Sequence, residues 1–222
     1  MKSLKNSLSL LGLTAALMVP ASGAIALVDT EATVRDGTQA DTDQDEATAG
    51  YVMVKFSSTG SARQAFFQFD LTGQNADLSQ AADFSMFLQS AKSQEIQVWA
   101  LDQAYTGFTS GITWNNAQAN DTSNNEMLTV GAFTATKIGG TIAVPGTSIG
   151  DEVIANLASL TPFVFDDKIT FAVTGIDNVS NNSGGLRIER GASELEFAQV
   201  PEPSSFALLG LAGFGSMLRR KR

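Results

Sequence analysis

The stretch ARQAFFQFDL, from Ala62 to Leu71, decides the fold class of this chain. In an extended chain, successive side chains point to opposite faces of the sheet. One face of this stretch then carries apolar side chains, namely Ala65, Phe67, Phe69 and Leu71. The other face carries polar ones, namely Gln64, Gln68 and Asp70. Such alternation predicts a half-buried strand of an antiparallel sheet.

The same alternation recurs along the middle of the chain. It is found at residues 83–89, 96–100, 169–173, 186–188 and 195–197. Polar turn clusters such as SSTGS and NVSNNSGG separate these segments, which predicts an all-β, jelly-roll-type β-sandwich. One segment departs from the rule: in DEVIANLASL (Asp151–Leu160), Val153, Ile154, Leu157 and Leu160 fall at helical spacing. It predicts one short helix on the edge of the sandwich.

Composition excludes several classes of site. The 222 residues include no Cys and no His, which excludes disulfides, thiolate or imidazole metal ligands, and Ser-His or Cys-His catalysis. The chain has 14 basic and 23 acidic residues, and six of the basic ones lie at the two ends. The part from Leu27 to Pro203 therefore has a net charge near −15, which disfavours nucleic acid and anionic lipid as partners.

The first 26 residues have the form of a secretory signal peptide. Lys2 and Lys5 precede an apolar run from Leu8 to Val19, and Ala24 and Ala26 give a small-x-small cleavage pattern. The sequence therefore predicts export and a mature chain that starts at Leu27. The alternative, an uncleaved membrane anchor, is disfavoured because the apolar run is short for a span.

The last 23 residues have three consecutive parts. They are a Val-Pro-Glu-Pro motif (Val200, Pro201, Glu202 and Pro203), an apolar run (Ser204–Leu218) and a basic tail (Arg219–Arg222). At about 1.5 Å per residue, a 15-residue helix is shorter than a hydrocarbon core of about 30 Å. The order resembles a PEP-CTERM sorting signal. That resemblance implies a Gram-negative bacterium that makes exopolysaccharide, and processing by an exosortase-type membrane protease. The alternative is a plain C-terminal anchor.

An acidic stretch, VRDGTQADTDQDE, follows the first predicted strand. Its candidate ligands for a metal ion are Asp36, Asp41, Asp43 and Asp45. Carboxylates at this density repel one another unless water or a cation screens them, and hard oxygen ligands suit calcium. The spacing is not that of an EF-hand, so a solvated acidic loop is the alternative.

Aromatic, amide and basic residues supply the candidates for sugar binding. Trp99, Tyr105 and Trp114 offer faces for stacking on a sugar ring, and Asn115 and Asn116 offer amides for hydroxyl groups. Trp99 has the opposite parity to Ile96 and Val98, which predicts that it faces outward. The alternative places Trp114 in the core and the two Asn residues in a turn. An acidic glycan would require bridging calcium or a basic patch, for which the candidates are Arg35, Lys55, Arg63 and Arg187.

Five motifs together resemble the DNRLRE domain, which is related to carbohydrate-binding module family 96. They are VRDGTQADT, VKFSSTGSARQAFFQFDL, QVWAL, ITWNN and RIERGASELEF. The resemblance covers residues 27–199 and implies a jelly-roll domain of secreted and surface proteins, some of which bind polysaccharide.

The expected organisation is thus a signal peptide (1–26), one β domain (27–199) and a sorting signal (200–222). We expect a non-enzymatic protein that is tethered to the inner membrane during sorting and then located at the cell surface or in the extracellular matrix. Its expected partners are extracellular polysaccharide and the processing protease, with calcium as the one candidate cofactor. The alternatives are a structural or adhesive matrix protein that binds no specific sugar, and a polysaccharide lyase or glycoside hydrolase.

Overall fold

A computed structural model describes residues 23–43, 50–57, 60–91, 93–102, 111–122, 134–146, 150–176 and 185–198. This part of the chain forms antiparallel β-structure with two short 3-10 turns, η1 (Gly37–Gln39) and η3 (Thr161–Phe163). The strands are β1 (Ala24–Arg35), β2 (Tyr51–Val54), β3 (Arg63–Asp70), β4 (Ala82–Ser90), β5 (Gln94–Leu101), β6 (Ala135–Val144), β7 (Glu152–Leu157), β8 (Lys168–Ile176), β9 (Leu186–Glu189) and β10 (Glu194–Phe197). The all-β prediction is confirmed.

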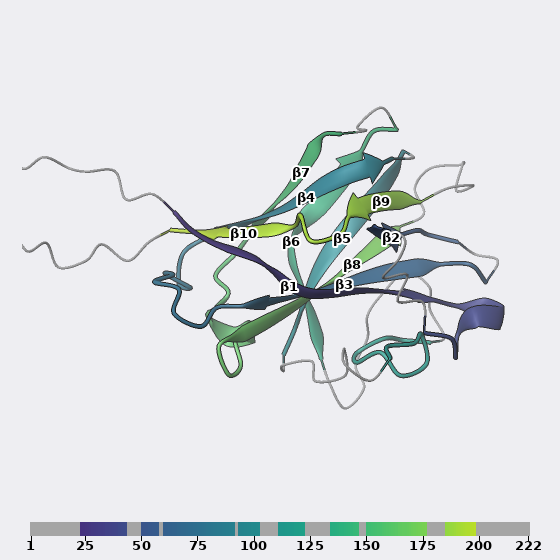
Figure 1. Cartoon of the computed structure of the whole chain (residues 1–222), viewed down its shortest axis with the longest axis horizontal. Coiled ribbons are helices and arrows are strands. Elements are labelled where there is room, and N and C mark those ends of the chain that lie inside the picture. The colour runs from purple at the N-terminus through teal and green to yellow at the C-terminus, as the bar shows by residue number, and fades with distance from the viewer. Residues whose placement is uncertain are drawn as a thin grey trace, which may run out of the picture.

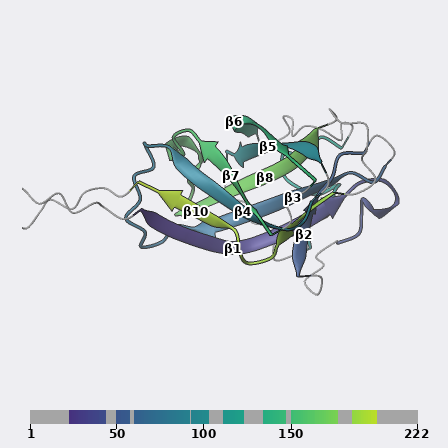
Figure 2. The same ribbon diagram turned by 90° about the horizontal axis from the view of Figure 1, so that it is seen from above.

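The long strand β1 belongs to both layers of the fold. Its first residues, Ala24–Leu27, pair with β10, and the rest of the strand pairs with β3 after a register shift between Val28 and Thr30. The strand order is β2-β9-β4-β10-β1-β3-β8-β5-β6, with β7 on the other edge of β4. This path folds back on itself at β1, so that β4, β7 and β10 lie over β3 and β8 (Figures 1 and 2).

The first core lies between the two layers and is built around four phenylalanines. Phe67 and Phe69 come from β3, Phe84 from β4 and Phe171 from β8, and all four are fully buried. The ring of Phe84 lies 5.3 Å from that of Phe67 and 5.3 Å from that of Phe171, measured between centroids. The apolar face predicted from the alternation in Ala62–Leu71 is therefore the face that joins the layers.

A second core covers the opposite face of β3, β5 and β8. Phe66, Trp99 and Ala172 come from these strands, and the segment 111–120 supplies Ile112 and Trp114 against them. Because β3 is buried on both faces from Gln64 to Phe69, its burial does not alternate along the strand as its apolar and polar residues do. Strands covered on both sides carry apolar residues at both parities.

The predicted short helix at Asp151–Leu160 is wrong. Residues Glu152–Leu157 form β7, which pairs with β4 from Ala82↔Leu157 to Phe87↔Glu152. Ala155 and Leu157 are buried, whereas Ile154 is 45% exposed. The spacing of the apolar residues fits a strand as well as a helix, and pairing with the exposed edge of β4 stabilises the extended form. Adjacent β-branched Val153 and Ile154 also favour a strand.

The two ends of the described domain lie together. Ala24 pairs with Phe197, and the chain enters and leaves on the same side of the molecule (Figure 1). Ala24 and Ala26 are buried in the first core, so β1 begins three residues before the predicted mature start at Leu27. Within the residues that the structure describes, none forms a helix with the length and apolar character that a membrane crossing requires.

Candidate functional site

Both tryptophans are core residues. Trp99 is 5% exposed and Trp114 is 2% exposed, and the indole Nε1 of Trp99 donates a hydrogen bond of 3.0 Å to Oγ1 of Thr174. The prediction that Trp99 faces outward is wrong, because the side chain is not exposed to solvent. Its side chain does point away from the first core, but the segment 111–120 covers that face. Neither ring is available for stacking on a sugar, and Tyr105 lies outside the described residues.

Asn115 and Asn116 are exposed, but their amides are used in local structure. The side chain of Asn116 accepts from the backbone N–H of Thr113 (2.6 Å) and donates to the carbonyl of Gly111 (3.1 Å). Asn115 donates to Oδ1 of Asp41 at 2.6 Å. These contacts agree with the alternative that the pair forms a turn, and they join this turn to the acidic stretch.

The described carboxylates of the acidic stretch do not lie together as one group of metal ligands. Asp41 bonds to Asn115, and Asp36 is only 5% exposed, with no hydrogen-bond partner for its Oδ1. Among the residues that can be placed, no group of three or more Asp or Glu side chains could hold a metal ion. Asp45 lies outside the described residues. The described members, Asp36, Asp41 and Asp43, therefore do not fit a calcium site by themselves.

Burial raises the pKa of Asp36 above 3.8, against the opposing effects of a hydrogen bond with the Ala62 backbone and the positive charges of Arg35 and Lys55. Between pH 3.8 and the raised pKa, the folded state binds more protons at this group than the unfolded state does. Ionisation of Asp36 therefore makes the unfolding free energy fall as pH rises through this window.

We expect Asp36→Asn to remove this decline. Urea unfolding at a series of pH values from below 3.8 to 7 should show the variant gaining stability relative to the unmodified chain as pH rises. Asp77→Asn is the matched control: the Ser79 hydrogen bonds lower the pKa of Asp77, so this variant should lose relative stability as pH rises. Parallel pH curves for Asp36→Asn and the unmodified chain would contradict the assignment.

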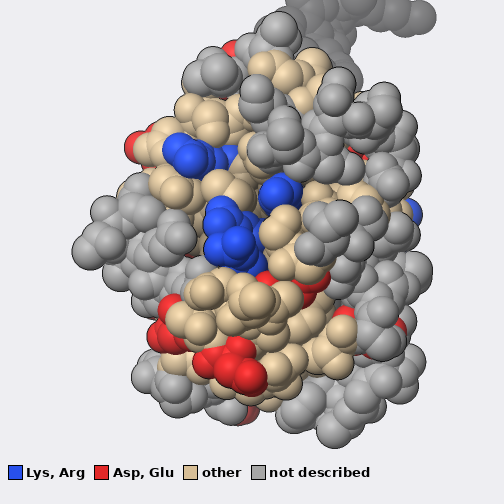
Figure 3. Space-filling model, turned by 90° about the vertical axis from the view of Figure 1, so that its right-hand side faces the viewer, with Lys and Arg blue, Asp and Glu red and all other residues tan. Residues whose placement is uncertain are grey.

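Three basic residues form a row across adjacent strands at one end of the sandwich. Arg35 of β1 is directly opposite Arg63 of β3, and Arg63 is directly opposite Lys55, which follows β2. Directly paired residues project to the same face, with Cβ atoms about 4.5–5.5 Å apart. All three side chains are partly exposed. Figure 3 shows Lys and Arg atoms gathered in the middle of this end, above a group of Asp and Glu atoms.

The row continues onto β2 and β9. The guanidinium of Arg63 contacts the sulfur of Met53, and Met53 is paired with Arg187. The guanidinium of Arg187 lies over the ring of Tyr51, 4.5 Å from its centroid. We call Arg35, Lys55, Arg63, Arg187 and Tyr51 the basic end. Sequence reasoning named the four cations but missed Tyr51, which belongs to none of the predicted strands.

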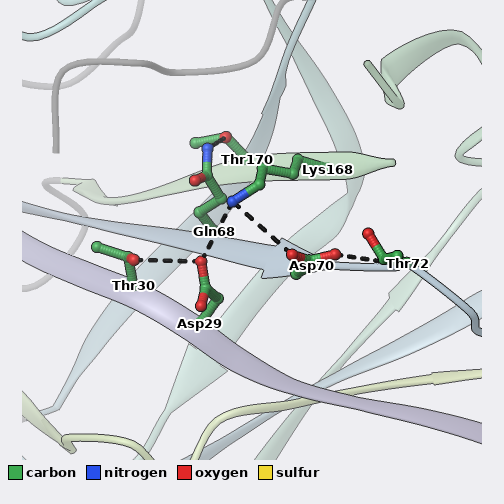
Figure 4. A network of polar contacts seen from close by, with 7 residues as sticks. All are labelled: Asp29, Thr30, Gln68, Asp70, Thr72, Lys168 and Thr170. Carbon is green, nitrogen blue, oxygen red and sulfur yellow. Dashed lines mark hydrogen bonds and ion pairs between the residues drawn. The ribbon is translucent and has the colours of Figure 1, made fainter. Parts of the chain in front are cut away.

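A second charged cluster lies away from the basic end. Nζ of Lys168 is 3.4 Å from Oδ2 of Asp29 and 3.9 Å from Oδ2 of Asp70 (Figure 4). Hydrogen bonds from Thr72 lower the pKa of Asp70, which is the opposite of the raised pKa that a general acid needs. This exposed network therefore has the character of a surface ion pair.

Comparison with models of protein families identifies one part of the chain, its C-terminal segment. Residues 199–222 match the PEP-CTERM protein-sorting motif, which confirms the sorting signal predicted from the last residues. A search of curated proteins returned no match to this chain. The motif indicates that the chain is exported through a sorting system, is held at the membrane during sorting, and has an exosortase-type protease as its processing partner.

Proposed function

We propose that this protein is a non-catalytic, exported polysaccharide-binding protein, whose β domain holds acidic extracellular polysaccharide at the basic end. It acts at the cell surface or in the extracellular matrix of a Gram-negative bacterium. The observation that carries the proposal is the row Arg35–Arg63–Lys55, in which Arg35 of β1 and Lys55, just after β2, lie on either side of Arg63 of β3 in a strongly acidic chain.

Like charges directly opposite one another destabilise a sheet. The Asp36 carboxylate interacts with Arg35 and Lys55 and offsets part of this repulsion, and a bound anion would offset more of it. Neighbouring strands lie about 4.8 Å apart, and cations repeated at this interval suit an extended polyanion. Guanidinium groups bind carboxylates with two parallel hydrogen bonds, which adds geometric selectivity. An acidic polysaccharide that carries carboxylates along its chain fits this chemistry.

The direction of the tether supports the proposal. Gly23 and Ala198 lie at the end of the sandwich opposite to Arg35 and Arg63, because β1 runs between the two ends and the short β10 pairs with its first residues (Figure 1). A domain held at the membrane through its C-terminal segment would therefore direct the basic end outward, where polysaccharide is found. The proposal also retains the expectation of a DNRLRE-type jelly-roll domain.

The test is a binding assay of the exported chain on an alginate-type acidic polysaccharide and on a neutral glucan. We expect saturable binding to the acidic polymer, weakened by salt, with no shortening of the polymer. Lys55→Gln combined with Arg63→Gln should weaken affinity about tenfold or more, because a hydrogen bond to a charged group contributes about 1.5–3 kcal/mol. EDTA should have no effect, since the cations contact the polymer directly.

Lys137→Gln is the matched control, because Lys137 is an exposed cation on β6, away from the basic end. It should leave affinity unchanged. An equal loss in this control would mean that only overall charge matters. Binding abolished by EDTA would favour calcium bridging, and no binding to either polymer would favour the structural or adhesive role.

A further inference from the structure

The expected signal peptide carries two adjacent patterns for cleavage, and the fold distinguishes between them. Ala21-Ser22-Gly23 and Ala24-Ile25-Ala26 both have small residues at the first and third positions, as signal peptidase requires. Cleavage after the first leaves Ala24 as the first residue, whereas cleavage after the second leaves Leu27. From the pairing of β1, we infer that the chain is cut between Gly23 and Ala24. This inference rests on the export proposed above.

The residues that the later cut would remove belong to the folded domain. Ala24, Ile25 and Ala26 pair with Phe197, Glu196 and Leu195 of β10. Of the four residue pairs that join β1 to β10, only Leu27↔Glu194 would remain. Ala24 and Ala26 are also packed in the first core, at 6% and 1% exposure. Their loss would open the edge of β10 beside Phe197, and unpaired edges invite association with other chains.

The site of the earlier cut is suited to a chain end. A Cβ placed on Gly23 would come within 2.6 Å of Oε1 of Glu196 and 2.9 Å of the carbonyl oxygen of Phe197. This position therefore has no room for a side chain. Cleavage before Ala24 places the new α-ammonium group next to the position of Gly23, and so close to the Glu196 carboxylate. Opposite charges at this range attract, so the mature end would be held against β10.

The experiment is N-terminal sequencing of the processed full-length chain from a Gram-negative host. We expect the sequence Ala-Ile-Ala-Leu; a start at Leu-Val-Asp-Thr would overturn the inference while leaving export intact. An uncut precursor would overturn the inference and favour the alternative of an uncleaved N-terminal membrane anchor. The polysaccharide assay is independent of all three outcomes, because it depends on residues at the opposite end of the domain.

A pair of variants outside β1 tests the same cut without disturbing the fold. Ala21→Leu places a bulky residue two positions before Gly23, and we expect it to reduce the chains that start at Ala24 at least tenfold. Ser22→Leu makes the same kind of change at the tolerant middle position and should be processed normally. If both variants are processed as the unmodified chain is, the recognised pattern is the later one and the inference fails.

Discussion

Replacing Phe84 with Ala is expected to lower the free energy of unfolding by about 3–5 kcal/mol, because large-to-small changes lose both transfer energy and packing around the cavity. Phe84 projects from β4 onto the other layer. Its ring stacks on that of Phe171 at an interplanar angle of 28° and meets the edge of Phe69 at 84°. The side chain thus joins three strands from both layers, and urea unfolding followed by fluorescence would measure the loss.

Phe165→Ala is the matched control for this experiment. Phe165 is 38% exposed, so the same change of residue should alter stability by only about 0.5 kcal/mol. Phe84→Leu should fall between the two, since Leu fills part of the cavity. Equal effects at Phe84 and Phe165 would contradict the assignment of Phe84 to the centre of the first core.

Trp114→Ala is expected to have an effect of similar size, about 3–5 kcal/mol, because it empties the second core. The segment that carries Trp114 has no sheet ladder of its own. It is held by this indole and by a few hydrogen bonds, such as Asn120 Nδ2 to the Trp114 carbonyl at 2.7 Å. The polysaccharide affinity of the fraction that remains folded should be unchanged, because Trp114 lies outside the basic end.

The same assay separates a core role from a binding role. Asn115→Ala is the neighbouring control: it removes the exposed hydrogen bond to Asp41 and should cost about 1 kcal/mol or less. A Trp114→Ala variant with full stability and lost binding would restore the stacking role that the sequence suggested. A variant with lost stability and retained affinity agrees with the buried position.

The sequence predicted a strand correctly where the apolar residues fit only the two-residue period of an extended chain. In Ala62–Leu71, the alternation of Phe67 and Phe69 with Gln68 and Asp70 admits only an extended chain, although it did not reveal that the second face is buried too. In Glu152–Leu157 both periods fit, and the edge of β4 decided the outcome. Sequence alone contains no information on which edge is available, because β4 and β7 are separated by more than 60 residues.

The candidate site depended even more on tertiary structure. The parity of Trp99 indicated correctly that it points away from Phe171, but the segment that covers it begins twelve residues later and crosses back over the sheet. Arg35, Lys55 and Arg63 are scattered in the sequence, and only the register of β1, β3 and the end of β2 places them side by side. Register is set by nonlocal pairing, which composition does not reveal.

The sorting signal, by contrast, was determined by the sequence itself. A membrane protease reads a short linear motif, and the apolar run and basic tail act through hydrophobicity and charge, which are local properties. The same holds for the all-β class, which follows from period-two alternation. The burial of the tryptophans, the row of cations and the pairing of Ala24 with Phe197 were decided only by the tertiary structure, because each depends on contacts between residues distant in the chain.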